Sequence, residues 1–432
     1  MEIVNIFYLL SVFIIFFSIR LPIPVSKLDN SLTYIDHLVF NIMIQINLIL
    51  FLSLLNMPLK IILGVYFSFL FVCFIFQYKN FCKIKLFITN HNYFYFFILI
   101  ILFLICVDVA YSIILDWDAQ KFWFPKALNF YNNETIQNLA NAPNPQYPFL
   151  GSLLWALFWK ISFFPEEYTG RLVYVFLYCI SIASLTETLK LSNKVKMIFF
   201  IILILLSYKY ILFSGSQDLL IFCLISIAAK ILYEIIGNKK RVSLYQFVLL
   251  LLICNSLIWT KQEGTIYAFI IIFTMLFFSK INQVKSMTLL GLVIFLFTIR
   301  IFVFKFYNLD ISINNCCWKD LSFNSIIEKF RLDRIAIIIT FFLFSFLKNS
   351  FFLLGLLFLL ASIFSKKIIK NDLYIYFFYI MSYCFIFSAY ILSGNKDLVW
   401  MLKTGIDRLI FSASPFYILI VVSYINTHNL KI

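Results

Sequence analysis

The chain has 432 residues, of which 63% are hydrophobic and only 13% are charged, and its mean hydropathy is +0.97. Soluble domains carry about 25% charged residues, so this composition excludes an ordinary soluble protein and predicts an all-α protein that crosses a membrane many times. The net charge is +15, but the basic residues lie in short clusters between apolar runs. That distribution is typical of cytoplasmic loops, so we expect no nucleic-acid partner.

The apolar runs follow one another along the whole chain, and many of them reach the roughly 17–25 residues that a spanning helix needs. No separate soluble domain interrupts them, so we expect one integral membrane domain over residues 1–432. The runs lie near 3–19, 36–56, 58–77, 93–115, 149–164, 170–189, 197–213, 217–236, 243–259, 265–279, 287–304, 335–347, 350–365, 373–391 and 409–425.

Five basic clusters separate these runs, and if all five are cytoplasmic, an even number of spans must lie between consecutive clusters. Two short runs, 149–164 and 335–347, break this parity, and both are flanked by charged residues. We therefore interpret them as helices that lie in the outer membrane interface. About 13 spans remain, with the amino terminus outside and the carboxy terminus inside. The clusters are Lys79/Lys83/Lys85, Lys190/Lys194/Lys196, Lys239/Lys240/Arg241, Lys280/Lys285 and Lys366/Lys367/Lys370.

This topology predicts that the remaining polar segments meet on one side of the membrane. None of them was used to set the topology, yet all of them fall on the non-cytoplasmic side. We therefore expect a single site there. The segments are 116–148, 214–218, 261–264, 305–334 and 393–408.

The longest of these segments, 116–148, begins with Asp116-Trp117-Asp118 directly after an apolar run. Carboxylates at a membrane edge are often retained for a site. The pair could bind a divalent cation such as Mg²⁺ or Mn²⁺ through its oxygens, or one carboxylate could act as a general base. The structural alternative is a solvated helix end. Nothing else in the sequence requires a metal, since the nine cysteines lack CxxC spacing and only three histidines exist.

Further along this loop, Trp123 and Lys126 belong to a predicted interfacial helix, and Tyr147 precedes Pro148 at the start of the next apolar run. Aromatic residues at the interface are common membrane anchors, which gives Trp123 a structural explanation. Lys126 could contact a lipid phosphate or extend along the membrane surface.

The other polar segments place charged residues at predicted helix ends. Asp218 begins one apolar run, whereas Lys261 and Glu263 lie between two others. Asp407 and Arg408 lie at the predicted mouth of the last span, where Arg408 could bind a phosphate through two hydrogen bonds. Capping and helix-dipole compensation give a structural explanation for each of these residues.

Together these motifs resemble the GT-C superfamily of membrane glycosyltransferases, which includes protein mannosyltransferases and aminoarabinose transferases. The resemblance rests on a WDA…W…KA loop, a YP element, a G..D turn, a K.EG turn and a terminal T..DRL…P segment, between residues 116 and 415. This chain has Asp-Trp-Asp where the better-known members have an Asp-Glu pair.

The resemblance implies an inverting transfer of a sugar from a polyprenyl-phosphate donor to a lipid, glycan or protein acceptor at the outer face, in a bacterial inner membrane. Asp116 or Asp118 would deprotonate the acceptor, and Trp123 and Tyr147 could stack on the sugar. The leaving phosphate would be stabilised first by Lys261 and Arg408 and then by Lys126, with Glu263 and Asp407 positioning the cations. A transporter or flippase of lipid-linked saccharides, or a polymerase, is the alternative.

Overall fold

The computed structural model describes residues 2–19, 32–81, 92–112, 114–208, 213–237, 239, 241–279, 282–309, 329–364, 372–393 and 398–428. All regular secondary structure within these residues is helical, which confirms the predicted all-α class. Most of the polar segment 305–334 lies outside the described residues, so the structure does not test its predicted position.

The helices follow the apolar runs, and most begin and end within a few residues of them. The first nine are α1 Glu2–Ser18, α2 Tyr34–Leu54, α3 Leu59–Phe81, α4 Asn92–Tyr111, η2 Ala119–Trp123, α5 Phe124–Tyr131, η3 Ile136–Asn141, α6 Leu150–Ile161 and α7 Glu167–Thr186. The others are α8 Asn193–Ser207, α9 Asp218–Leu232, η5 Tyr233–Gly237, α10 Leu244–Thr260, α11 Gln262–Phe278, α12 Gln283–Phe306, α14 Leu332–Lys348, α15 Ser350–Phe364, α16 Leu373–Leu392, α17 Leu398–Ala413 and α18 Pro415–His428.

Eight helices in the described part of the chain are long and apolar enough to cross a membrane, or up to nine if a bent pair counts as one span. Four further apolar helices, α1, α6, α10 and α11, are shorter than 18 residues. The protein is therefore a multi-pass integral membrane protein. Its hydrophobic surface agrees with this, because large apolar side chains such as Phe71, Leu205 and Phe364 are exposed and would contact lipid.

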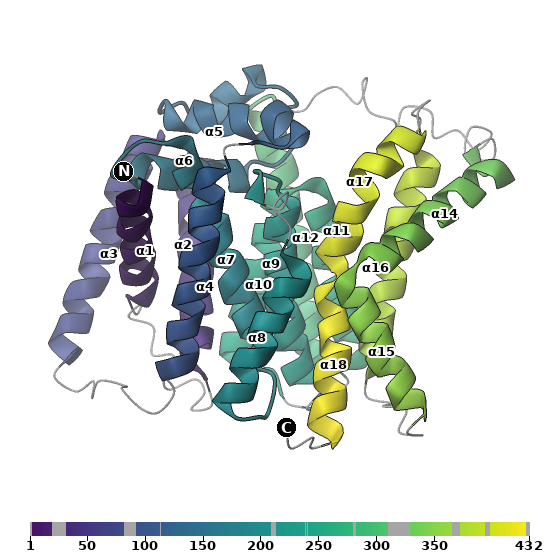
Figure 1. Cartoon of the computed structure of the whole chain (residues 1–432). Helices are drawn as coiled ribbons and strands as arrows, with labels where there is room; N and C mark the ends of the chain where they lie inside the picture. Colours follow the sequence, from purple (N-terminus) through teal and green to yellow (C-terminus); the bar gives the residue numbers. More distant parts are fainter. Residues whose placement is uncertain are drawn as a thin grey trace.

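The bundle is organised around α7 and α9, which pack on each other over most of their length and are almost completely buried. The predicted 116–148 loop forms η2, α5 and η3, which lie with α6 across one end of the bundle (Figure 1). The amino terminus is at this end and the carboxy terminus is at the opposite end. Which of these ends faces the outside remains a prediction.

Two local features differ from the sequence-based expectation. We predicted a loop over 393–408, and this is wrong from Leu398 onward, where α17 begins. The helix continues through Ser414 into α18. Asp407 and Arg408 therefore lie inside a helix and not at its end. The second feature is the junction of α14 and α15, which are bent by 82° relative to each other. We predicted that 335–347 lies in the interface and that 350–365 spans separately; the structure shows a bend between them at Asn349.

Candidate functional site

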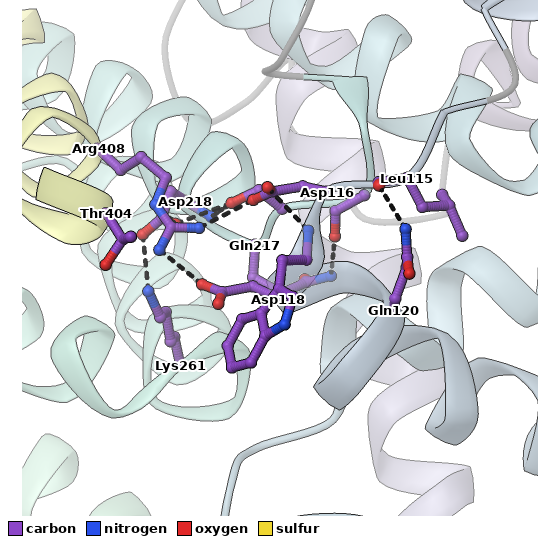
Figure 2. A network of polar contacts seen from close by, with 12 residues as sticks. Leu115, Asp116, Asp118, Gln120, Gln217, Asp218, Lys261, Thr404 and Arg408 are labelled. Atoms are coloured by element: carbon purple, nitrogen blue, oxygen red, sulfur yellow. Dashed lines mark hydrogen bonds and ion pairs between the residues drawn. The ribbon is translucent and has the colours of Figure 1, made fainter. Parts of the chain in front are cut away.

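Three polar segments from distant parts of the sequence meet at Arg408 of α17 (Figure 2). Its Nη1 lies 3.1 Å from Oδ2 of Asp116, and its Nη2 lies 2.6 Å from Oδ2 of Asp118. These three side chains are about one-fifth exposed. A guanidinium group has two donor edges in a fixed plane, so one arginine can engage both aspartates of the Asp-Trp-Asp motif.

A fourth charged group, Asp218, connects Arg408 to Lys261. Oδ1 of Asp218 lies 2.8 Å from Nζ of Lys261, and Oδ2 lies 3.8 Å from Nε of Arg408. Ser216 adds a hydrogen bond to the same carboxylate, with its Oγ donating to Oδ2 at 2.8 Å. Asp218 and Lys261 are both buried, so this ion pair is shielded from water and strongly coupled.

Helix ends place these two residues as the sequence predicts. Asp218 is the first residue of α9, and Lys261 is an extended residue between the last residue of α10 and the first of α11. Burial alone would lower the pKa of Lys261, but Asp218 and Glu263 outweigh burial and raise the pKa above its usual value. The charged form of Lys261 is therefore favoured by its two acidic neighbours.

Glu263 completes the cluster but remains only partly satisfied. Its Oε1 is 3.5 Å from Nζ of Lys261, while its Oε2 is buried without a hydrogen-bond partner among the described residues. Counting Asp116, Asp118, Asp218 and Glu263 against Lys261 and Arg408 gives four acidic and two basic groups. The cluster thus has more carboxylates than cations.

Two glycines allow the backbone to bring these segments together. Gly215 has φ +93°, and a Cβ atom there would lie 2.7 Å from the ring of Trp155. Its neighbour Ser214 accepts a hydrogen bond from the backbone N–H of Asp116 at 3.0 Å, which fixes the start of the acidic motif. At Gly264, a Cβ atom would lie 2.1 Å from the carbonyl oxygen of Leu257. Only glycine permits α10 and α11 to approach so closely around Lys261.

A cavity of about 590 Å³ lies beside the cluster. Asp116, Asp118 and Arg408 contribute its polar wall, and α17 adds Lys403 and Asp407. Lys348 and Asn349 line it from the bend between α14 and α15; Trp117, Trp400, Phe351 and Phe411 give it apolar surface. The cavity thus combines acidic, basic and apolar groups. We define it as the acidic cavity.

The remaining predicted residues occupy different positions. Asp407 lines the acidic cavity and is bound by Ser345 and by Lys348, the latter at 3.6 Å. Trp123, Lys126 and Tyr147 pack together inside the loop. Nζ of Lys126 is buried and donates to the carbonyl oxygens of Asn144 and Tyr147 at 2.9 and 2.6 Å.

Burial, followed by the charge of Arg300, lowers the pKa of Lys126 to about 7. Tyr147 lies 5.8 Å from Trp123, ring centre to ring centre. Trp123, Lys126 and Tyr147 therefore contact one another within the loop 116–148 and do not line the acidic cavity. Their predicted contact with a lipid phosphate or a sugar remains a prediction.

Several cavity residues were not predicted from the sequence. Lys348 and Asn349 lie between two apolar runs, and their polarity is the only signal in the sequence that marks them as candidates. Lys403 and Trp400 fall in a segment that we interpreted as a loop, so their helical spacing with Asp407 was not recognised. Gln217, the neighbour of Asp218, was not predicted either; its amide nitrogen donates to the hydroxyl oxygen of Tyr174 at 3.0 Å.

Comparison of the chain with known protein families, with curated proteins and with solved structures finds no match. The resemblance to GT-C glycosyltransferases therefore rests on the sequence motifs alone. Among the described residues, no group of three His, Cys, Asp or Glu side chains is arranged to hold a metal ion. Asp116 and Asp118 are the candidate ligands, and Arg408 engages one oxygen of each; a divalent cation at this pair remains a prediction.

Proposed function

We propose that the protein is an inverting glycosyltransferase of the GT-C type, which moves a sugar from a polyprenyl-phosphate donor to an acceptor. The proposal includes a bundle of about 13 spans in a bacterial inner membrane, with the acidic cavity facing the periplasm. One observation carries it: Asp116 and Asp118 share a cavity wall with Arg408, beside Lys348 and Lys403. A general base and a cationic site for a phosphate thus border the same space.

The cationic residues of the cavity suit the leaving group. Arg408 can present two donors to one phosphate, and Lys403 and Lys348 add point charges from α17 and the α14–α15 bend. Such groups stabilise the negative charge that develops on the departing phosphate. Lys261 does not line the cavity, so we assign it an indirect role: it holds Asp218, and Asp218 faces Arg408.

The two aspartates suit the acceptor. In the proposed step, Asp116 or Asp118 takes the proton of the acceptor hydroxyl, and the acceptor oxygen attacks the anomeric carbon of the sugar. The bond from that carbon to the phosphate oxygen breaks, and polyprenyl phosphate leaves as an anion with inversion at the anomeric carbon. Arg408 binds both carboxylates in the free protein. An incoming phosphate would compete for Arg408 and release the base.

The apolar part of the cavity suits a lipid-linked sugar. Trp117 and Trp400 lie edge to face with ring centres 5.9 Å apart, and aromatic faces bind the apolar faces of sugars. Leu206 and Trp117, which also line the cavity, would contact the first units of the prenyl chain. The proposed partners are a polyprenyl-phosphate sugar, a lipid, glycan or protein acceptor, and the surrounding membrane lipids.

The test compares purified wild type with Asp116→Asn, Asp118→Asn and the control Asp333→Asn, whose side chain is exposed and bound to Arg331. Each is incubated with short-chain polyprenyl-phosphate sugars and a membrane-lipid extract, and products are followed by mass spectrometry. We expect transfer by wild type and the control, and a loss of about 10²-fold or more in one aspartate variant. If neither aspartate substitution lowers the rate of transfer, the proposed base is wrong.

A transporter of lipid-linked saccharides is favoured by a second buried ion cluster at the other end of α9. Nζ of Lys230 lies 2.5 Å from Asp36 and 3.9 Å from Glu234. Residues 219–229 of α9, between this cluster and Asp218, are apolar or small and buried, so no row of charges joins the two clusters along α9. Movement of the donor across liposomes, without consumption and in all variants, would support this alternative.

A further inference from the structure

A second cavity, of about 460 Å³, lies where η3 meets the end of α12. We define it as the amide pocket. It is lined by Gln137, Asn138, Asn141, Phe306, Tyr307 and Asn308, together with Ala140. None of these residues is charged. The pocket belongs in part to the same 116–148 loop that begins with the acidic motif, and it is separate from the acidic cavity in its lining residues.

The chemistry of this lining points to hydroxyl groups. Each amide side chain offers two N–H donors and a carbonyl acceptor, and adjacent hydroxyls of a sugar match this pairing. None of the four amide nitrogens in the pocket has a hydrogen-bond partner in the described part of the chain. They are therefore free to bind a ligand. Among the described residues of the lining there is no cation, which disfavours phosphate and carboxylate ligands.

An aromatic surface accompanies the amides. Phe306 is 65% exposed and lies edge to face with Tyr307, with ring centres 5.0 Å apart. Phe306 and Tyr307 are at the end of α12 and face the three amide residues of η3 across the pocket. An exposed ring beside unpaired amides provides both an apolar contact for the C–H face of a sugar and polar contacts for its hydroxyls.

Both walls are fixed by their own hydrogen bonds. In η3, Oδ1 of Asn138 accepts from the backbone N–H and the hydroxyl of Thr135, both at 3.0 Å, which leaves its amide nitrogen available. At the end of α12, Asn308 has φ 54°, and Leu309 N–H donates to the carbonyl of Phe304 at 2.8 Å. This is a left-handed helix C-terminus closed by a six-to-one hydrogen bond. A pocket with fixed walls loses less entropy when a ligand binds.

From these observations we propose that the amide pocket binds a neutral saccharide. Binding of a saccharide at the amide pocket does not depend on the transferase reaction. The further claim that this saccharide is the glycan acceptor rests on the proposed function. Such a site would hold one part of the acceptor while another hydroxyl of the same molecule reacts at the acidic cavity.

The test uses the full-length protein in lipid nanodiscs without glycoside detergents, because a maltoside headgroup would compete. Maltotriose, chitotriose and mannotriose are probed by saturation-transfer NMR, with trigalacturonate as an anionic comparator of similar size. Asn141→Ala and Asn308→Gly remove amides, and Gly at 308 retains the left-handed backbone. Asn132→Ala is the matched control, because Asn132 is an exposed amide of the same loop outside the pocket.

We expect saturation transfer to at least one neutral trisaccharide and a weaker signal from trigalacturonate. Asn141→Ala and Asn308→Gly should each weaken binding about fivefold or more, and Asn132→Ala should leave it unchanged. Phe306→Ser serves as a further variant if one of these does not fold. Asp116→Asn should still bind the sugar, so loss of transfer and loss of sugar binding can be told apart. The proposal is overturned if no neutral probe binds, or if the pocket variants bind as wild type does.

Discussion

Asp218 of α9 and Arg408 of α17 face each other, with Oδ2 of the aspartate 3.8 Å from Nε of the arginine. That Nε is buried and has no hydrogen-bond partner among the described residues. The other oxygen of Asp218 binds Lys261. One buried carboxylate therefore lies between two cations, and it positions Arg408 although it does not itself line the acidic cavity.

Asp218→Asn should destabilise the protein strongly, because it leaves the buried Lys261 without its closest counter-ion. Removing one member of a buried ion pair costs about 3–5 kcal/mol. Unfolding of the detergent-solubilised protein should show this loss relative to wild type. The double variant Asp218→Asn/Lys261→Met should recover part of it, since the uncompensated charge is then absent. If the two substitutions were simply additive, the pair would not be coupled as the structure indicates.

Arg408→Lys should reduce transfer while preserving the fold. A lysine ammonium is a point charge and cannot reproduce the fork with which Arg408 reaches Asp116 and Asp118 together. Since the substitution removes a donor that the proposed transition state needs, we expect a decrease of about 10²-fold or more in the rate of transfer. Thermal unfolding and donor binding should be measured beside the rate. A fully active lysine variant would exclude a bidentate role for Arg408.

The position of the site could be predicted from the sequence because charged residues stood at helix ends. Asp218 begins α9 and Lys261 separates α10 from α11, so the basic clusters that set the topology also placed both on one side. The extent of α17 could not be predicted in the same way. Lys403, Asp407 and Arg408 lower the local hydropathy, but they line a cavity, so the helix begins at Leu398, earlier than the apolar run.

The α14–α15 bend shows a second limit of the sequence. Its residues read as an apolar run, a short polar interruption and another apolar run, which is equally consistent with an interfacial helix or a bent pair. The bend puts Lys348 and Asn349 into the acidic cavity. That arrangement depends on packing against α17 and not on local sequence preference. The amide pocket was missed for a similar reason, since its two walls come from residues about 170 positions apart.

Gly215→Ala should destabilise the protein and disturb the acidic motif. The residue has φ +93°, and its Cβ would lie within 3 Å of Trp155 and Ala119, so alanine adds both backbone strain and a steric clash. Strain of this kind costs about 1–3 kcal/mol. The matched control is Gly291→Ala in α12, where a Cβ would meet nothing within 4 Å. A lower unfolding temperature for Gly215→Ala alone is the expected result, and equal unfolding temperatures would contradict it.

Lys126 should make the stability of the protein depend on pH in an unusual direction. Burial lowers the pKa of Lys126 from 10.5 to about 7 in the folded state, so between these values the unfolded chain holds one more proton than the folded chain. The free energy of unfolding should therefore rise with pH across this window, by at most about 1.4 kcal/mol per pH unit, and should be insensitive to Lys126 well below pH 7.

The measurement compares wild type with Lys126→Met between pH 6 and 9. Methionine preserves the apolar stem but removes the hydrogen bonds that Lys126 donates to the carbonyl oxygens of Asn144 and Tyr147. The variant should therefore be less stable by about 1–3 kcal/mol, and its stability should rise less steeply with pH. A wild type and a variant with the same pH slope would show that Lys126 remains protonated in the folded loop.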